Sequence, residues 1–394
     1  MLQDVETCSP SYPFDQGKSG EDLHPLYGAL GPGVHRVRMV QAGLDAFMVT
    51  DYALLRQVFE DEATFRPLEE NIPGIPPVQG TLLGMWGSDH RRVRRPAVAS
   101  FTAHAVRERL PGIGAQVAGR LEALAARGRP VDLVSEFAFP LTLAVLGETL
   151  GVPEDDRHLF ADWGDRYVDL TDLGEAERAA REMCAYIAEA LERRRAAGPA
   201  SDLLSRYVHT EHGLRVSGEE AAMVGMAVIV AGWESTAGLI TSMVHYLLTH
   251  LDQWERLVAD PALADNAVHE LLRTRAAGSD DGPARRTTRD VVLGGVEIPA
   301  GTIVLVAKDA ANRDAARFPD PDAVDLARPD ADENLSFGAG PHVCLGRNLG
   351  VAVLRCVLSE LAARHPGARL TGEPVTWQEG SGVRRPERLM VTLV

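Results

Sequence analysis

The sequence predicts a mainly α-helical protein with small β-sheets, folded as a single domain over residues 1–394. Apolar residues recur at helical spacing over 104–127 and 174–196, with many Arg, Glu and Ala between them. Residues 287–307 instead have β-branched runs broken by Gly-Gly and Pro-Ala-Gly, which predicts short strands joined by turns. We find no internal repeat and no obvious linker, which favours one large domain.

The longest apolar run covers residues 218–250, and Glu234 is the only acidic residue between Ala221 and Tyr246. About 20 apolar residues can span a bilayer, so a transmembrane helix has to be considered. A carboxylate near the middle of such a helix is costly in lipid. The run therefore predicts a helix that is buried on all sides in a large protein core.

Irregular structure is expected on both sides of these helices. Residues 313–335 are rich in Asp, Pro and Ala, which predicts a meander without regular elements. The segment 65–87 is rich in Pro and Gly and predicts a long loop. Residues 1–20 are expected to be flexible.

Composition narrows the class of protein. The formal net charge of −16 disfavours nucleic-acid binding and favours solubility. The four cysteines show no paired spacing, so neither a disulfide framework nor a structural zinc site is indicated. The first residues, MLQDVETCSPSYPF, contain neither a secretory signal nor a membrane anchor. We therefore expect a monomeric cytoplasmic protein that does not bind membranes.

The stretch FGAGPHVCLG, residues 337–346, places Cys344 among three glycines and just before an apparent helix start. Glycines let the backbone come close to a flat ligand, and a helix N-terminus favours the negative charge of a thiolate. This suits axial ligation of haem iron. The rivals are weaker, because the stretch lacks the third glycine of a dinucleotide site, and the two-residue spacing from His342 does not by itself favour a Cys–His nucleophile pair. A cysteine taken alone is most often a small buried hydrophobe.

Residues 337–346 match every fixed position of Phe-Gly-x-Gly-x-His-x-Cys-x-Gly, the haem-binding loop of the cytochrome P450 superfamily. The chain resembles a soluble bacterial member, and the resemblance extends to ANRD at 311–314 and FPDPD at 318–322. It implies the P450 fold, with haem b between a long central helix and the Cys344 loop. Cys344 would be the iron ligand, and Phe337 and Gly338 would contact the haem.

The sequence Ala231-Gly-Trp-Glu-Ser-Thr236 lies inside the long apolar run. By itself it fits a helix bend equally well as a site. It resembles the family's oxygen-activation motif, which implies that Glu234, Ser235 and Thr236 are catalytic and relay protons. Serine at 235 departs from the family's threonine, and it loses the methyl group that restricts χ1.

Basic residues that match the family's haem-propionate partners are spread along the chain. His90 and Arg94 are four residues apart on one helix face, Arg285 precedes the strand at Val291, and His342 lies in the cysteine loop. Arg286 is a near alternative to Arg285. Taken singly, each of these residues reads as an ordinary surface charge, and their joint match to the family makes them candidate haem partners.

Glu270 and Arg273 match the family's structural ExxR pair, which elsewhere gains a third partner from an Arg-Phe in the meander. Here that place reads Ala323-Val324, and either Arg317 or Arg328 is a candidate substitute. The resemblance alone does not choose between them.

The resemblance implies a monooxygenase that inserts one oxygen atom into a small organic substrate. Oxidative coupling, cyclisation and peroxide-driven oxidation are the alternatives, and a non-enzymatic haem sensor is a third. No flavin or iron–sulfur segment is found, so we expect electrons from a ferredoxin and a ferredoxin reductase. The sequence also contains a cluster of basic residues, Arg91, Arg92, Arg95 and Arg347. We expect this cluster to dock the ferredoxin, and the alternative is that it forms an ordinary solvated helix face.

The substrate is expected to be a bacterial natural product, either free or bound to a carrier protein. By analogy with the family, the loop 65–86 and the residues near Trp233 would line its pocket. Trp233 could instead be a core residue. Asp280 and Asp281 would face a cationic substrate or form an exposed acidic turn.

Overall fold

The structure is a computed structural model, and it describes residues 9–14, 22–70, 72–73, 81–168, 173–275, 284–378 and 383–394. The helices are α1 Pro25–Leu30, α2 Tyr52–Glu60, α3 Gly87–Val98, α4 Ala103–Ala125, α5 Phe139–Leu150, α6 Arg157–Val168, α7 Leu173–Ala197, α8 Leu203–His209, α9 Gly218–Thr249, α10 Leu251–Ala259, α11 Ala264–Thr274, α12 Lys308–Ala311 and α13 Arg347–Arg364. The strands are β1 Ser11–Tyr12, β2 Val34–Met39, β3 Leu44–Val49, β4 Phe65–Pro67, β5 Val131–Asp132, β6 Arg285–Thr287, β7 Val291–Leu293, β8 Val296–Ile298, β9 Ile303–Val306, β10 Arg369–Leu370 and β11 Met390–Thr392.

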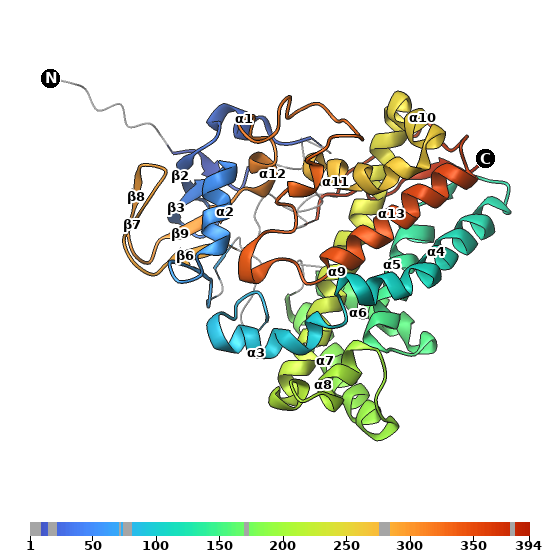
Figure 1. The fold of residues 1–394 in the computed structure, drawn as a ribbon, viewed down its shortest axis with the longest axis horizontal. Helices are drawn as coiled ribbons and strands as arrows, with labels where there is room; N and C mark the ends of the chain where they lie inside the picture. Colours follow the sequence, from blue (N-terminus) through green and yellow to red (C-terminus); the bar gives the residue numbers. More distant parts are fainter. Residues whose placement is uncertain are drawn as a thin grey trace.

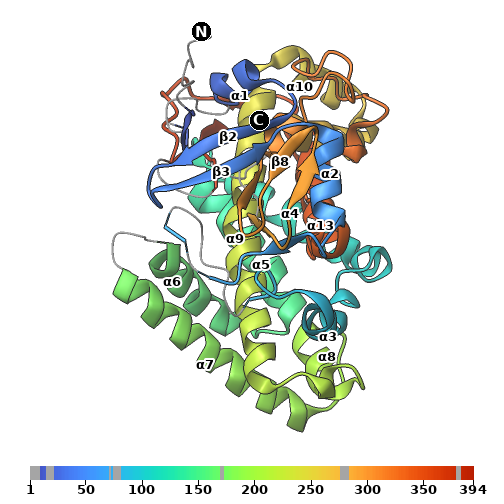
Figure 2. The same ribbon diagram turned by 90° about the vertical axis from the view of Figure 1, so that its left-hand side faces the viewer.

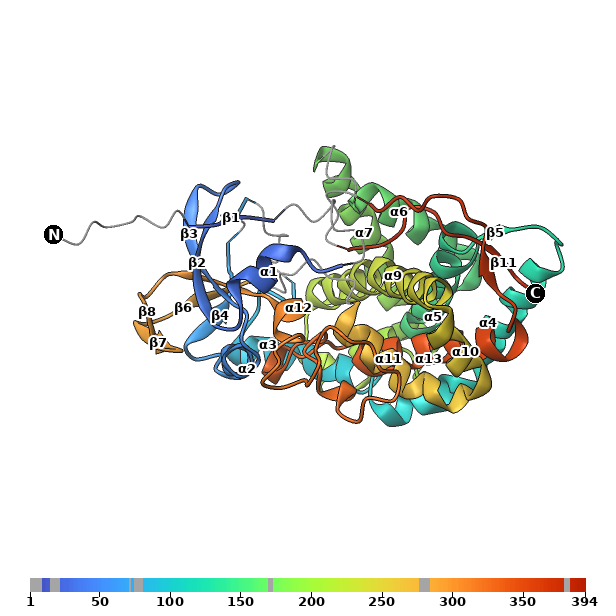
Figure 3. The same ribbon diagram turned by 90° about the horizontal axis from the view of Figure 1, so that it is seen from above.

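Helices make up most of the molecule, and most of the strands gather at one end of it (Figures 1 and 3). The largest sheet has six strands in the order β1-β2-β3-β9-β6-β4. It joins chain segments far apart in sequence, because β3 pairs in parallel with β9, with Ala46 opposite Ile303. The predicted strands at 287–307 are thus confirmed, with turns at Gly294-Gly295 and at Gly301, where φ is positive.

Helix α9 crosses the molecule from end to end (Figure 2). It begins with a capping box in which the Ser217 and Glu220 side chains bond each other's backbone N–H groups. By length and composition it could cross a membrane, but 56% of its most apolar stretch is buried inside the protein. Since α9 packs against α5, α7 and α13, the prediction of a core helix is confirmed. The expectation that it is buried on all sides is wrong, because Ala231 is exposed and Ser235 is partly exposed.

The Glu270–Arg273 pair on α11 is buried and belongs to a larger cluster. Glu270 accepts two hydrogen bonds from Arg273, at 2.8 and 2.9 Å, and both side chains are 0% exposed. Arg328 donates to the same carboxylate at 3.1 Å, so Arg328 takes the third place. Arg317 does not take it, because it pairs with Asp330 and Glu333 instead.

Candidate active site

The cysteine loop is held by backbone geometry that only glycine adopts easily. Gly338 and Gly340 both have φ of +67°. A Cβ atom on Gly340 would lie 2.3 Å from the carbonyl oxygen of Phe59, so this glycine also allows a close approach to the end of α2. The Cys344 N–H donates to the Phe337 carbonyl at 2.9 Å, which closes the loop just before α13.

The Cys344 thiol is accessible, although protein surrounds it closely enough for burial to raise its pKa. The two findings agree if the sulfur borders an internal space rather than the outer surface. The N–H groups of Gly346 and Arg347 donate to the sulfur, and Lys308 and Arg94 attract its negative charge; these act to lower the pKa. The loop is therefore prepared to stabilise a thiolate once a metal displaces the proton.

The middle of α9 has an open face. Ala231 is exposed within a helix that is otherwise largely buried, and Ser235, one turn further on, is partly exposed. The Ser235 hydroxyl donates to the Ala231 carbonyl at 2.5 Å. Thr236, the next residue on this helix, is partly exposed like Ser235.

Glu234 is buried and points to a partner that the sequence did not suggest. Its Oε1 lies 3.6 Å from Nε of Arg385, and both side chains are less than 15% exposed. The guanidinium of Arg385 also lies 4.9 Å from the ring centre of Phe139. No motif marks Arg385, since only the fold brings the C-terminal segment beside α9.

The four predicted propionate partners come from three parts of the chain. The rings of His90, on α3, and His342, in the cysteine loop, stack at 4.0 Å. Burial lowers the pKa of each histidine to about 4. Arg285 on β6 is 2% exposed, and burial lowers its pKa to about 10. Arg94 donates to the Val343 carbonyl at 2.5 Å.

Arg286, the near alternative, lies on the outer side of the strand. It pairs with Glu70 and donates to the Gly301 carbonyl. Arg285 is therefore the arginine of β6 that faces inward.

Trp233 does not form a pocket wall. It is 4% exposed, and its Nε1–H donates to the Phe139 carbonyl at 3.2 Å. A Cβ atom on Gly164 of α6 would lie 1.9 Å from the Trp233 ring, so the indole fills the α6–α9 contact. The pocket-wall hypothesis is wrong, and the core alternative holds. Asp280 and Asp281 lie outside the described residues, as do Asn71 and residues 74–80 of the loop 65–86.

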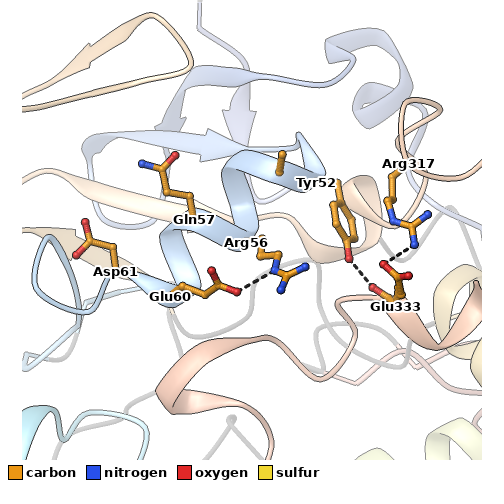
Figure 4. A pocket seen from close by; sticks show the side chains of 8 residues that line it. Tyr52, Arg56, Gln57, Glu60, Asp61, Arg317 and Glu333 are labelled. Carbon is orange, nitrogen blue, oxygen red and sulfur yellow. Dashed lines mark hydrogen bonds and ion pairs between the residues drawn. The ribbon is translucent and has the colours of Figure 1, made fainter.

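An open pocket of about 730 Å³ lies beside α2, and no residue of the cysteine loop 337–346 lines it. Its side chains largely bond one another: Arg56 with Glu60, Tyr52 with the Glu333 carbonyl, and Arg317 with the Glu333 carboxylate (Figure 4). None of the predicted site residues lines it, so we assign it no catalytic part.

The family model for cytochrome P450 matches residues 165–364. The chain belongs to the cytochrome P450 family. It is 36% identical to the nocardicin C N-oxygenase of Nocardia uniformis subsp. tsuyamanensis, over 98% of this chain and 100% of the relative. It is also 36% identical to the mycinamicin IV hydroxylase/epoxidase of Micromonospora griseorubida, over 97% and 98% of the two chains.

Solved P450 structures have the same fold. The LnmA hydroxylase from the leinamycin pathway of Streptomyces atroolivaceus S-140 superposes with a TM-score of 0.90 at 34% identity, covering 97% of this chain and 99% of that one. The protein is thus a cytochrome P450 monooxygenase with the mainly helical P450 fold, and the family implies a haem-thiolate cofactor. Its relatives include enzymes of secondary metabolism.

The residues present fit a haem. Both ring nitrogens of His90 are buried without a hydrogen-bond partner among the described residues, although buried polar groups are normally paired. A propionate oxygen would accept a hydrogen bond from the protonated ring nitrogen. The accessible Cys344 thiol and the open face at Ala231 and Ser235 leave the sulfur and the helix available to such a group.

Proposed function

We propose that this P450 oxidises a small bacterial natural product, with Cys344 as the iron ligand. The haem, when bound, supplies oxygen activation, and the thiolate favours O–O cleavage. The observation that carries the proposal is the joint presence of an accessible cysteine with two backbone donors and of the buried His90, whose ring nitrogens have no hydrogen-bond partner among the described residues. His90, Arg94, Arg285 and His342 would bind the propionates.

The residues of α9 would handle protons. Ser235 presents its hydroxyl at the open face of the helix, and Glu234 would provide the exchangeable proton behind it. Thr236 is the third member of the predicted relay. The proposal predicts that Ser235→Ala lowers the fraction of electrons that end in product, while Ser235→Thr preserves or raises it. Equal coupling in both variants and the wild type would argue against the relay.

The substrate class is the first thing to measure. Purified ferric protein is titrated with aromatic, peptide-like, macrolide and terpene compounds while the Soret band is followed. A shift towards high spin identifies a class that displaces the iron-bound water. A panel without any shift, from protein with an intact haem-thiolate spectrum, points to a carrier-bound or unsampled substrate.

Reactions other than hydroxylation should be tested with the same panel of compounds, because one relative is named a hydroxylase/epoxidase and a solved neighbour is described as mixed-function. Oxidative coupling, cyclisation and peroxide-driven turnover are the alternatives to simple hydroxylation. Product analysis with and without added peroxide separates them. We further propose that the protein works as a monomer in the cytoplasm, where a ferredoxin and its reductase supply electrons.

A further inference from the structure

A carboxylate that no motif marks lies among the predicted propionate partners. Glu62 follows α2, and its Oε1 is 2.9 Å from Nε2 of His342. The same oxygen accepts a 3.3 Å hydrogen bond from the N–H of Gly87. The side chains of Glu62 and His342 are only 15% and 7% exposed, so solvent screens this contact weakly.

These two hydrogen bonds join separate parts of the predicted haem site. Gly87 is the first residue of α3, which carries His90 and Arg94. His342 belongs to the loop that carries Cys344, and it stacks on His90. Glu62 therefore connects the start of α3 to the cysteine loop. Its charge also attracts Arg285, since it acts to raise the pKa of that arginine against the effect of burial.

A metal ion is a poor explanation for this group, although ligand atoms of Glu62, His90 and His342 lie within 4.8 Å of one another. The two imidazole planes are inclined by only 19°, with ring centres 4.0 Å apart. Lone pairs of imidazole nitrogens lie in the ring planes, and metal–nitrogen bonds are about 2.0–2.1 Å long. Two nearly parallel planes at this separation do not meet at such a distance. The pair cannot ligate one ion as it stands.

We propose that Glu62 is a positioning residue of the haem pocket, which fixes His342 and the start of α3 for the propionates and lowers the reduction potential of the bound iron. Reduction adds one negative charge to the haem. A fixed carboxylate in a weakly screened site disfavours that charge and so favours the ferric state. The proposal rests on haem binding but not on any particular substrate.

The test uses the holoprotein and two readouts that need no turnover: the reduction potential, and the rate of haem transfer to apomyoglobin. Glu62→Gln keeps the size and an acceptor oxygen but removes the charge, so the potential should rise while haem transfer stays near the wild-type rate. Glu62→Ala should raise the potential and also release haem several times faster. Glu60→Gln, an exposed neighbour that pairs with Arg56, is the matched control and should change neither readout.

Unchanged potentials in Glu62→Gln and Glu62→Ala would overturn the proposal. So would an equal rise in Glu60→Gln, because that would make the effect one of overall charge. If Glu62→Ala yields no folded protein, Glu62→Gln alone still decides the sign of the potential change. These measurements need no substrate, so they remain valid even if every substrate titration fails. The proposal for Glu62 and the proposal for the substrate class can therefore be refuted independently.

Discussion

Two buried polar clusters of this molecule differ in how completely their atoms are paired. Around Glu270, the carboxylate receives Arg273, Arg328 and the N–H of Asp325. The two guanidinium groups also donate to the backbone carbonyl of Asn312 and to backbone carbonyls of the meander. Around His90, by contrast, both ring nitrogens lack partners among the described residues. The first cluster is complete within the polypeptide, while the second is complete only with a ligand.

The largest effect is expected when the complete cluster is broken. Arg273→Ala leaves Glu270 buried with only Arg328 to compensate it, and should destabilise the protein by about 3–5 kcal/mol, as for other broken buried pairs. Denaturant unfolding measures this. Arg256→Ala is the control, because its pair with Asp325 is about half exposed and should contribute less than about 1 kcal/mol.

Arg328→Met tests the assignment of the third partner. The carboxylate keeps both hydrogen bonds from Arg273, so the loss should be smaller, about 1–3 kcal/mol from unpaired carbonyls of Pro319 and Asp320. Unfolding midpoints compare the two variants directly. A loss equal to that of Arg273→Ala would contradict this ranking, and no loss at all would remove Arg328 from the cluster.

The incomplete cluster should respond in the opposite way. His90→Phe removes two unpaired nitrogens from the interior, so the haem-free protein should be as stable as the wild type or more stable. The holoprotein should lose haem about tenfold faster, since a charge-assisted hydrogen bond to a propionate contributes about 1.4 kcal/mol or more. Haem transfer to apomyoglobin and denaturant unfolding give the two readouts. Destabilisation of the haem-free variant would mean that His90 has a structural role.

The buried His90 should also make the stability of the haem-free protein depend on pH. Burial lowers the pKa of His90 from 6.5 to about 4. Between pH 4 and pH 6.5, His90 is therefore protonated in the unfolded chain but neutral in the folded haem-free protein. The contribution of neutral His90 to the free energy of unfolding is fully present above pH 6.5 and is lost as the pH falls towards 4. Unfolding of the haem-free protein across this range should show a steeper loss for the wild type than for His90→Phe. Parallel curves would contradict the pKa shift.

The sequence predicted much of this arrangement, for reasons that differ between residues. Periodicity located α4, α7 and α9, because long amphipathic or apolar helices leave a direct pattern. The Cys344 loop was predicted because its glycine positions impose a backbone shape. Arg385 and Glu62 were missed, since each becomes a partner only when segments far apart in sequence meet. Trp233 was ambiguous because an aromatic residue suits a core and a pocket equally well.

The surface arginines of α3 repeat the contrast between paired and unpaired charge. Arg92 donates to Glu220 at 2.7 Å and to the Arg215 carbonyl at 3.1 Å, so it holds α3 to the start of α9. Arg91 and Arg95 are exposed, and the described residues give neither an ion pair. The docking hypothesis is therefore best tested at Arg91 and Arg95.

The double variant Arg91→Glu/Arg95→Glu should slow reduction by an acidic ferredoxin about tenfold at low salt, because complementary charge speeds encounter. The difference should shrink as salt is added, since screening weakens long-range attraction between exposed charges. Stopped-flow reduction of the ferric protein measures both. Arg181→Glu/Arg193→Glu on α7 changes the net charge by the same amount and controls for it, because the contacts of these arginines with Glu177 and Glu189 are exposed and 3.6 Å long. An equal slowing in that control would mean that overall charge, and not the α3 surface, guides the ferredoxin.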